Sequence, residues 1–153
     1  MNYFDFLENN DSEETYITHF EFFVGGYFGP SYFLFINGRK ENKVIWFGES
    51  EYGNYIEVKD PSVKTDENKG RIVKEIPLTD EEWKNFQEDI KKLKLDTWEV
   101  EYDDPDVMDG THWALIIDYS DNTGLISRGG NDYPKNWKVF LRFLKKYTNE
   151  NIE

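Results

Sequence analysis

The periodicity of the apolar residues changes at Leu78, and this change restricts the fold more than any other feature. Before it, short runs of aromatic and β-branched residues are separated by turn residues, which is typical of antiparallel strands joined as a meander. Asn37 and Gly38 give the clearest turn signal, because both accept the positive φ of a tight hairpin. Residues 59–70 are polar and predict an exposed loop. The expected strands are 15–24, 31–36, 43–47, 54–58 and 71–76.

After Leu78 the sequence predicts a helix that begins at Thr79 and ends near Lys94. Thr79 and Glu82 have the spacing of a capping box, and Leu78 can pack on Trp83 as a hydrophobic staple. The following apolar residues recur at the spacing of one helix face. They are Trp83, Phe86, Ile90 and Leu93.

The rest of the chain predicts three more strands and a second helix. Apolar and polar residues alternate over 97–102 and 112–119, as they do in strands with one solvated face. The turn residues 120–124 lead into a short return strand over 124–127, which makes a hairpin. A terminal helix is expected over 134–148, because apolar residues again follow a helical period. Its buried face is predicted to hold Trp137, Phe140, Leu141, Leu144 and Tyr147.

These elements predict an α+β fold in a single domain over residues 1–153. The expected sheet is antiparallel, has about six to eight strands, and carries helices 79–94 and 134–148 on one face. The chain contains 12 Phe, 10 Tyr and 5 Trp residues. Each such ring offers roughly 150–250 Å² of surface for burial, so aromatic rather than aliphatic side chains should build the core.

The composition excludes several classes of protein. Without cysteine the chain has no disulfides, no thiolate metal ligands and no cysteine nucleophile. The first residues lack the basic and apolar regions of a signal peptide, and no apolar run approaches the ~18 residues that span a membrane. We expect a soluble, cytoplasmic protein with no metal and no cofactor.

The net charge of −13 indicates what kind of partner the chain suits. An excess of acidic residues disfavours binding to phosphate backbones and to anionic lipid surfaces, so direct binding of nucleic acid or membrane is not expected. A protein partner with a basic surface is favoured instead. The terminal helix differs from this acidic background, since residues 134–148 hold no acid. Its bases are Lys135, Lys138, Arg142, Lys145 and Lys146.

Three short motifs in the second half resemble those of a family of small uncharacterised bacterial α+β proteins. PLTDEEW opens the first helix, DGTHW (109–113) fits the pattern D-G-x-x-W, and GGNDYPKNW (129–137) fits G-x-N-x-Y-P. The resemblance covers residues 77–147 and implies the fold but no activity. His112 departs from the pattern, which expects a polar residue that does not titrate. The matching residues are Asp109, Gly110, Trp113, Gly129, Asn131, Tyr133 and Pro134.

The acidic segment 96–110 is the first candidate site. Its carboxylates can bind a hard cation, act as a general acid and base, or present charge to a basic partner. The segment does not match the ligand pattern of a helix-loop-helix calcium site. So dense a run is solvated, whereas a catalytic carboxylate needs burial to raise its pKa. A wet strand face with an acidic turn is the structural interpretation, and charge presentation is the functional one. The carboxylates are Asp96, Glu99, Glu101, Asp103, Asp104, Asp106 and Asp109.

The segment SRGGNDYPKNW, residues 127–137, is the second candidate. Each of its turn residues has a structural explanation: the glycines permit unusual backbone angles and the proline suits a first helical turn. Asn131 or Asp132 can bond the free N–H groups at the helix start. Arg128 has no such explanation, and it either pairs with Asp132 or faces a ligand.

Aromatic residues and histidines complete the candidates. Tyr27 and Phe28 lie in a glycine-rich break and either pack under the sheet or, like Trp137, anchor a partner. His19 and His112 lie in strand patterns without an accompanying nucleophile motif, so they give little support for catalysis.

The sequence therefore favours an interaction protein, and two alternatives stay open. The expected protein occludes a basic partner, as an immunity protein, a phage-encoded inhibitor or a nucleic-acid mimic would. One alternative is an enzyme using Asp109, His112 and Arg128. The other is a small-ligand binder with a pocket between sheet and helices, closed by residues 129–134. The partner-binding residues are expected to be Glu99, Glu101, Asp103, Asp104, Asp106, Asp109, Tyr27, Phe28, Arg128 and Trp137.

Overall fold

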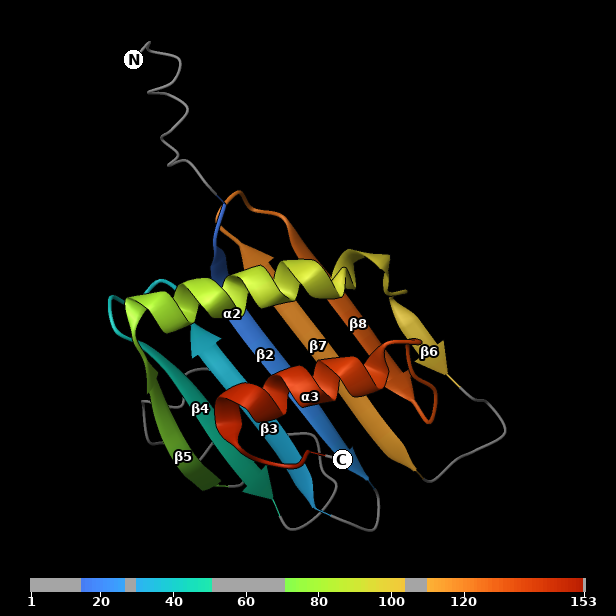
Figure 1. Cartoon of the computed structure of the whole chain (residues 1–153). Coiled ribbons are helices and arrows are strands. Elements are labelled where there is room, and N and C mark those ends of the chain that lie inside the picture. Colours follow the sequence, from blue (N-terminus) through green and yellow to red (C-terminus); the bar gives the residue numbers. More distant parts are fainter. Residues whose placement is uncertain (1–14, 27–29, 51–70, 104–109, 153) are drawn as a thin grey trace.

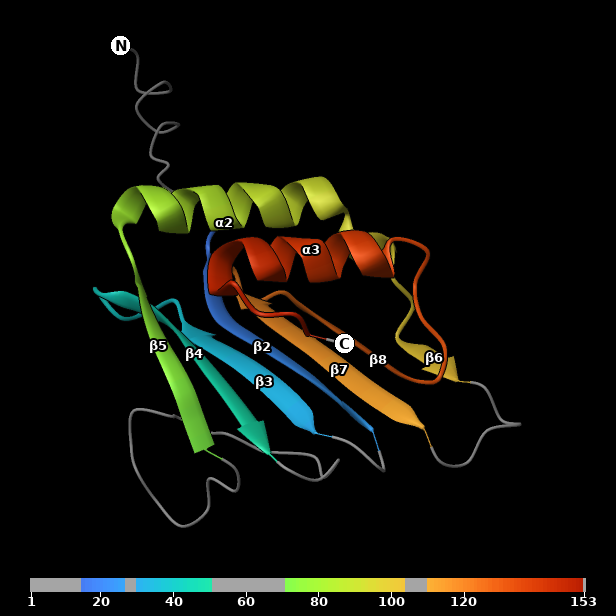
Figure 2. The same ribbon diagram turned by 60° about the horizontal axis from the view of Figure 1, so that its bottom comes forward.

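The computed structural model describes residues 15–26, 30–50, 71–103 and 110–152. These residues form a sheet of seven strands with two helices lying side by side across one face (Figures 1 and 2). The strands lie in the order β5-β4-β3-β2-β7-β8-β6. Their bounds are β2 (Ile17–Gly26), β3 (Ser31–Asn37), β4 (Lys43–Ser50), β5 (Arg71–Leu78), β6 (Glu101–Asp103), β7 (Thr111–Tyr119) and β8 (Gly124–Gly130). The helices are α2 (Asp80–Leu93) and α3 (Trp137–Thr148), with a short 3₁₀ helix η1 (Leu95–Thr97) after α2.

The central pair of strands joins the two halves of the chain. β2 pairs antiparallel with β3 on one side and with β7 on the other, so that Phe22 lies between Leu34 and Leu115. This register places the apolar faces of the meander and of the C-terminal hairpin in one continuous surface. The predicted α+β class and aromatic-rich sheet are confirmed by this arrangement. The predicted strand 54–58 and loop 59–70 lie outside the described residues.

The sheet is mixed, and in this the prediction of a wholly antiparallel sheet was wrong. β6 pairs parallel with β8, with Glu101 opposite Arg128. The cause is topological: β8 lies between β6 and β7, and both β6 and β8 run opposite to β7. All other pairs among the described strands are antiparallel.

The predicted strand at 97–102 is mostly absent. Lys94 takes a left-handed conformation (φ 53°) that ends α2, and η1 follows directly. Trp98 then turns into the core, where its Nε1 donates to the Asn136 Oδ1 atom at 2.7 Å. Val100, predicted to face the core, is 63% exposed. The alternation was misleading because only Glu101–Asp103 joins the sheet.

The core lies between the sheet and the two helices and is built mainly from aromatic rings. From the sheet, Phe20 contacts Phe86 of α2 edge to face, with ring centroids 5.3 Å apart. Phe22 contacts Phe140 of α3 in the same way at 5.0 Å. Such ring pairs contribute about 0.5–1.5 kcal/mol each beyond the area they bury. The predicted buried face of α2 is confirmed: Trp83, Phe86, Ile90 and Leu93 are all buried.

The predicted start of α2 is also confirmed. The Glu82 backbone N–H donates to Thr79 Oγ1 at 3.0 Å, and the Thr79 N–H donates to Glu82 Oε1 at 2.8 Å. These two bonds make a complete capping box. Neither α2 nor α3, the two α-helices of the described chain, has the length and apolarity that crossing a bilayer requires.

The second helix begins three residues later than predicted, at Trp137 rather than Pro134. Pro134 instead starts a turn in which its carbonyl accepts from the Trp137 N–H at 3.1 Å. Asn136 occupies the capping position, but its side chain makes no capping bond. Its Nδ2 donates to the Leu93 carbonyl at 2.9 Å while its Oδ1 accepts from Trp98, so it joins the end of α2 to the start of α3.

Candidate functional site

The sheet face opposite the helices carries a shallow hollow of about 580 Å³. Trp113, Leu115 and Ile117 of β7 belong to the core, so the alternating residues of this strand lie on the other face. Strands β2, β7, β8 and β6, which are neighbours in the sheet (Figure 2), all contribute residues to the hollow. Its lining comprises Phe23, Glu101, Tyr102, His112, Trp113, Ala114, Ile116, Ile126, Arg128, Gly129 and Gly130.

Glu101 and Tyr102 of β6 line one side of the hollow, and three hydrogen bonds hold the chain that leads into this strand. The Glu99 N–H donates to Tyr102 Oη at 2.9 Å, and Ser127 Oγ donates to the Glu99 carbonyl at 2.6 Å. The Arg128 N–H donates to the Val100 carbonyl at 2.9 Å. Residues 99–101 are thus fastened to β8, and their outward side chains are held on a fixed backbone.

The side chains of residues 99–101 combine carboxylates with an exposed apolar group, and of these three residues only Glu101 lines the hollow. Glu99 and Glu101 are exposed, and between them Val100 is 63% exposed. On the neighbouring strand Ile126 is 54% exposed. We call Glu99, Val100, Glu101, Ile126 and Arg128 the β6-edge surface.

Arg128 pairs with Glu101, and not with Asp132 as the sequence suggested. Its Nε lies 3.4 Å from Glu101 Oε2, and both side chains are largely exposed. An exposed pair of this kind contributes little to stability and leaves both groups accessible. The Asp132 carboxylate is used elsewhere, since its Oδ1 accepts from the Tyr133 N–H at 3.0 Å.

The loop of residues 127–137 serves the fold in this structure. Asn131 has φ 58°, and its Oδ1 accepts from the Thr111 N–H at 3.0 Å. The Asp132 carbonyl accepts from Trp113 Nε1 at 2.9 Å. Neither side chain caps α3, so the predicted capping role was wrong. Instead, both residues fasten the loop to the start of β7.

The structure places only some of the predicted site residues. Glu101 and Arg128 are paired in the β6-edge surface, and Glu99 is exposed two residues before Glu101. Asp96 is exposed after α2 and lies outside this group. The predicted residues that fall outside the described structure are Tyr27, Phe28, Asp104, Asp106 and Asp109, together with the side chain of Asp103.

Trp137 is half-buried, and most of its neighbours are other rings. Its centroid lies 4.8 Å from that of Trp113, 5.8 Å from that of Phe22 and 4.9 Å from that of Tyr133. Trp137 therefore closes the edge of the core. The part of it that stays accessible faces a second hollow beside α3.

The two histidines have different surroundings. His19 Nε2 lies 3.0 Å from Glu21 Oε1, and its ring rests edge-on against Phe35 at 5.0 Å. His112 lines the hollow together with Arg128. The described lining offers no Ser, Thr or Cys side chain for His112 to activate.

A polar network links the helices away from these surfaces. Asp89 of α2 accepts from Lys146 Nζ at 2.9 Å and from Tyr147 Oη at 2.7 Å, both in α3. Burial opposes ionisation, yet the bonds from Lys146 and Tyr147 outweigh it and hold the pKa of Asp89 below its usual value. Burial and the Asp89 carboxylate together raise the pKa of Tyr147. This network joins the two helices through the Oδ2 atom of Asp89.

The exposure of Val100 and Ile126 was not predicted from the sequence. Ile126 stands between Leu125 and Ser127, so its exposure depends on the strand register rather than on local pattern. Among the described residues no group of three or more histidines and carboxylates is placed to bind a metal ion.

Comparison with known proteins identifies no relative, so a functional assignment depends on the geometry of the described surfaces. No family model, no curated protein and no solved structure shows a significant match to this chain.

Proposed function

We propose that this protein binds a basic macromolecular partner through the β6-edge surface and acts by occluding it. The observation that carries the proposal is Val100, an apolar side chain 63% exposed between two exposed carboxylates on a hydrogen-bonded backbone. Protein interfaces combine an apolar centre with a polar rim in this way. The proposal identifies Val100 and Ile126 as the centre and Glu99 and Glu101 as the rim.

The net charge of the chain supports a basic partner. At −13 the protein attracts a positively charged surface over distances of about one Debye length, ~8–10 Å at physiological salt. Attraction of this kind raises the association rate and orients the two molecules, whereas the apolar contacts slow dissociation. An inhibitor of immunity or phage type works by such occlusion. Arg128, placed within the surface, favours a protein partner over mimicry of nucleic acid.

The test is a comparison of partners captured from the cell in which the protein is encoded. Wild type is compared with E99Q/E101Q, which removes the rim charges, and with V100D, which removes the apolar centre. The control E81Q/E88Q makes the same charge change on exposed positions of α2. We expect a basic protein that wild type and control recover equally and that both β6-edge variants lose. Equal recovery of every protein by all four would contradict the proposal.

A second function is favoured by one observation, the presence of His112 and Arg128 in the lining of the same hollow. A small-ligand protein or a hydrolase-like enzyme would use the hollow instead of the rim. A hollow of about 580 Å³ has the size of small-molecule sites in general. The variant H112A separates the two proposals: it should abolish ligand binding in the hollow but leave partner capture through Glu99 and Glu101 unchanged.

A further inference from the structure

The hollow beside α3 differs from the β6-edge surface in both charge and composition. It measures about 500 Å³ and lies between α3, the ends of β2 and β7, and the segment after α3. Its charged lining residues from α3 are all bases, although the protein as a whole is strongly acidic. The lining comprises Val24, Thr111, Tyr133, Trp137, Lys138, Leu141, Arg142, Lys145, Glu150, Asn151 and Ile152.

The three bases form a row along one side of the helix. Lys138, Arg142 and Lys145 are spaced four and three residues apart, so they lie on adjacent turns and repel one another. None of the three has an ion-pair partner within the described chain. Lys146 of the same helix does have one, since it bonds to Asp89 on the side facing α2. Within the described residues, the positive charge of these three side chains is therefore available to bind an anionic ligand.

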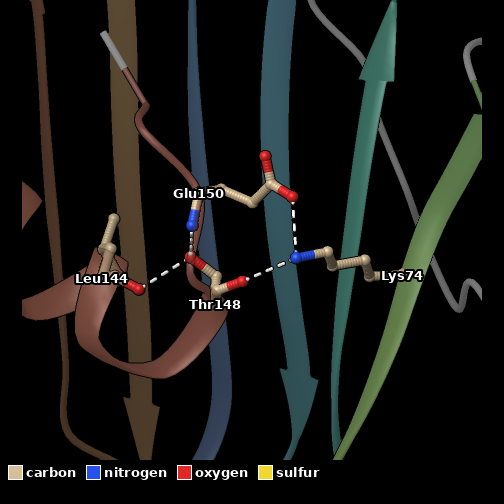
Figure 3. Close-up of polar contacts among 4 residues, drawn as sticks. All are labelled: Lys74, Leu144, Thr148 and Glu150. Atoms are coloured by element: carbon tan, nitrogen blue, oxygen red, sulfur yellow. Dashed lines mark hydrogen bonds and ion pairs between the residues drawn. The ribbon is translucent and has the colours of Figure 1, made fainter.

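Glu150 is the one carboxylate in this lining, and its side chain points toward Lys74 (Figure 3). Its Oε2 lies 2.8 Å from Nζ of Lys74 in β5. The same Nζ donates to the Thr148 carbonyl at 3.0 Å, and Thr148 Oγ1 in turn donates to the Leu144 carbonyl at 2.8 Å. Lys74 thus neutralises Glu150 and holds the segment after α3, residues 150–152, which also lines the hollow.

The same segment is anchored by burial further along. Ile152 is 2% exposed and belongs to the core cluster. The wall of the hollow is therefore a packed part of the fold, so the hollow has a fixed shape. The hollow also has an aromatic surface next to the bases. Tyr133 and Trp137 pack there with ring centroids 4.9 Å apart, and Tyr133 remains 37% exposed.

We propose that this hollow, the α3 pocket, binds a phosphorylated nucleoside. Aromatic side chains stack on nucleobases, and Lys and Arg bind phosphate through charge-assisted hydrogen bonds. The row from Lys138 to Lys145 extends about 10 Å along the axis at 1.5 Å per residue, which suits a chain of several phosphates. The ring of Tyr133 stacks on the base, Arg142 binds phosphate in a bidentate manner, and the two lysines bind as point charges.

The size of the pocket favours a mononucleotide over a nucleic-acid strand. About 500 Å³ lies within the range of small-ligand pockets. The acidic charge of the rest of the molecule would repel a long phosphate backbone. A short ligand places its charge on the row alone and avoids that repulsion.

The test is calorimetric titration of the full chain in magnesium-free buffer with three probes: ATP, adenosine and inorganic tripolyphosphate. We expect ATP to bind with a Kd below about 1 mM and more tightly than either of the other two. The variant K138Q/K145Q should weaken ATP binding about tenfold or more. The control K84Q/K91Q removes two lysines at the same seven-residue spacing from α2 and should leave the Kd unchanged.

Two further variants test the role of each wall. Y133A should weaken ATP but leave tripolyphosphate unaffected, because only the base stacks on the ring. K74Q should weaken both, because it frees the Glu150 carboxylate to approach the row. The proposal is overturned if ATP fails to bind, if tripolyphosphate or adenosine binds as tightly as ATP, or if K138Q/K145Q matches its control. E99Q/E101Q must keep full ATP affinity, so this proposal and the partner proposal can fail separately.

Discussion

Asn136 shows how one side chain determines the position of two helices. Its amide donates to the last turn of α2 and accepts from the Trp98 indole, so it satisfies two polar groups at the border of the core. A buried polar group that loses its partner costs more than the hydrogen bond itself contributes. Asn136 is therefore a structural residue, although it lies in a segment whose composition also suits a binding loop.

Asn136→Ala should lower the free energy of unfolding by about 1–3 kcal/mol, because it leaves the Leu93 carbonyl and the Trp98 N–H without partners. Chemical denaturation followed by tryptophan fluorescence measures the change. The neighbouring exposed substitution Lys135→Ala is the control and should alter stability by less than about 0.5 kcal/mol. Equal effects of the two substitutions would show that the two hydrogen bonds of Asn136 do not contribute to stability.

Gly129 is the second residue whose role is set by close contact. A Cβ atom there would lie 2.5 Å from Trp113 Nε1 and 2.7 Å from the Asp132 carbonyl, the two atoms that bond each other. Gly129→Ala should therefore destabilise the protein by about 1–3 kcal/mol. Gly26→Ala is the matched control, since its nearest neighbour would be 3.8 Å away. A thermal melt in which both variants unfold together would contradict this reading of the contact.

At the scale of elements, the local sequence was sufficient to predict a helix or strand where its ends depend on residues close by in the chain. The capping box predicted the start of α2 at Thr79, its N-cap, because both of its bonds join residues three positions apart. The start of α3 depends instead on Asn136 reaching across to Leu93 and Trp98. The short β6 pairs with β8 residues that lie 27 positions later, so no local period could reveal it. The charged residues of the β6-edge surface were predicted as partner-binding residues, whereas the exposure of Val100 and Ile126 was not, since the exposure of Ile126 follows from register.

The contact between α2 and α3 includes a charge whose contribution depends on pH. The folded state lowers the pKa of Asp89, so its ionised form stabilises the fold above the unfolded value of about 3.9, and that stability is lost as the pH falls through the folded value. Asp89→Asn should cost under about 1 kcal/mol at neutral pH, because Lys146 is mostly exposed.

The cost of Asp89→Asn should decrease as the pH falls below the unfolded value of about 3.9, because the wild-type carboxyl then takes up its proton. Urea denaturation of both proteins across this pH range measures it, with Glu88→Gln on the exposed side of α2 as the control. A difference that persists unchanged at low pH would show that the charge of Asp89 is not what stabilises the helix contact.

At the scale of the whole molecule, the fold separates charge of opposite sign. Carboxylates line the β6 edge, whereas the row of bases on α3 is kept free by the pairing of Glu150 with Lys74. The predictable part was the overall acidity and the basic helix, both visible in composition. The position of each surface was not predictable, because it depends on seven strands and two helices meeting in one arrangement.

Raising the salt concentration should weaken capture of the partner, since screening shortens the Debye length from about 10 Å at 0.1 M to about 3 Å at 1 M. The effect should fall mainly on the association rate, as measured by surface plasmon resonance with the captured partner. The E99Q/E101Q variant should show a smaller salt dependence than wild type. An identical dependence would remove these carboxylates from the encounter.

The most direct measurement is amide hydrogen exchange of the protein alone and in complex with its captured partner. Binding through the β6-edge surface predicts slower exchange in residues 99–103 and 124–128, with α2 unchanged. Protection confined to α2 or α3, with residues 99–103 exchanging as in the free protein, would contradict the account.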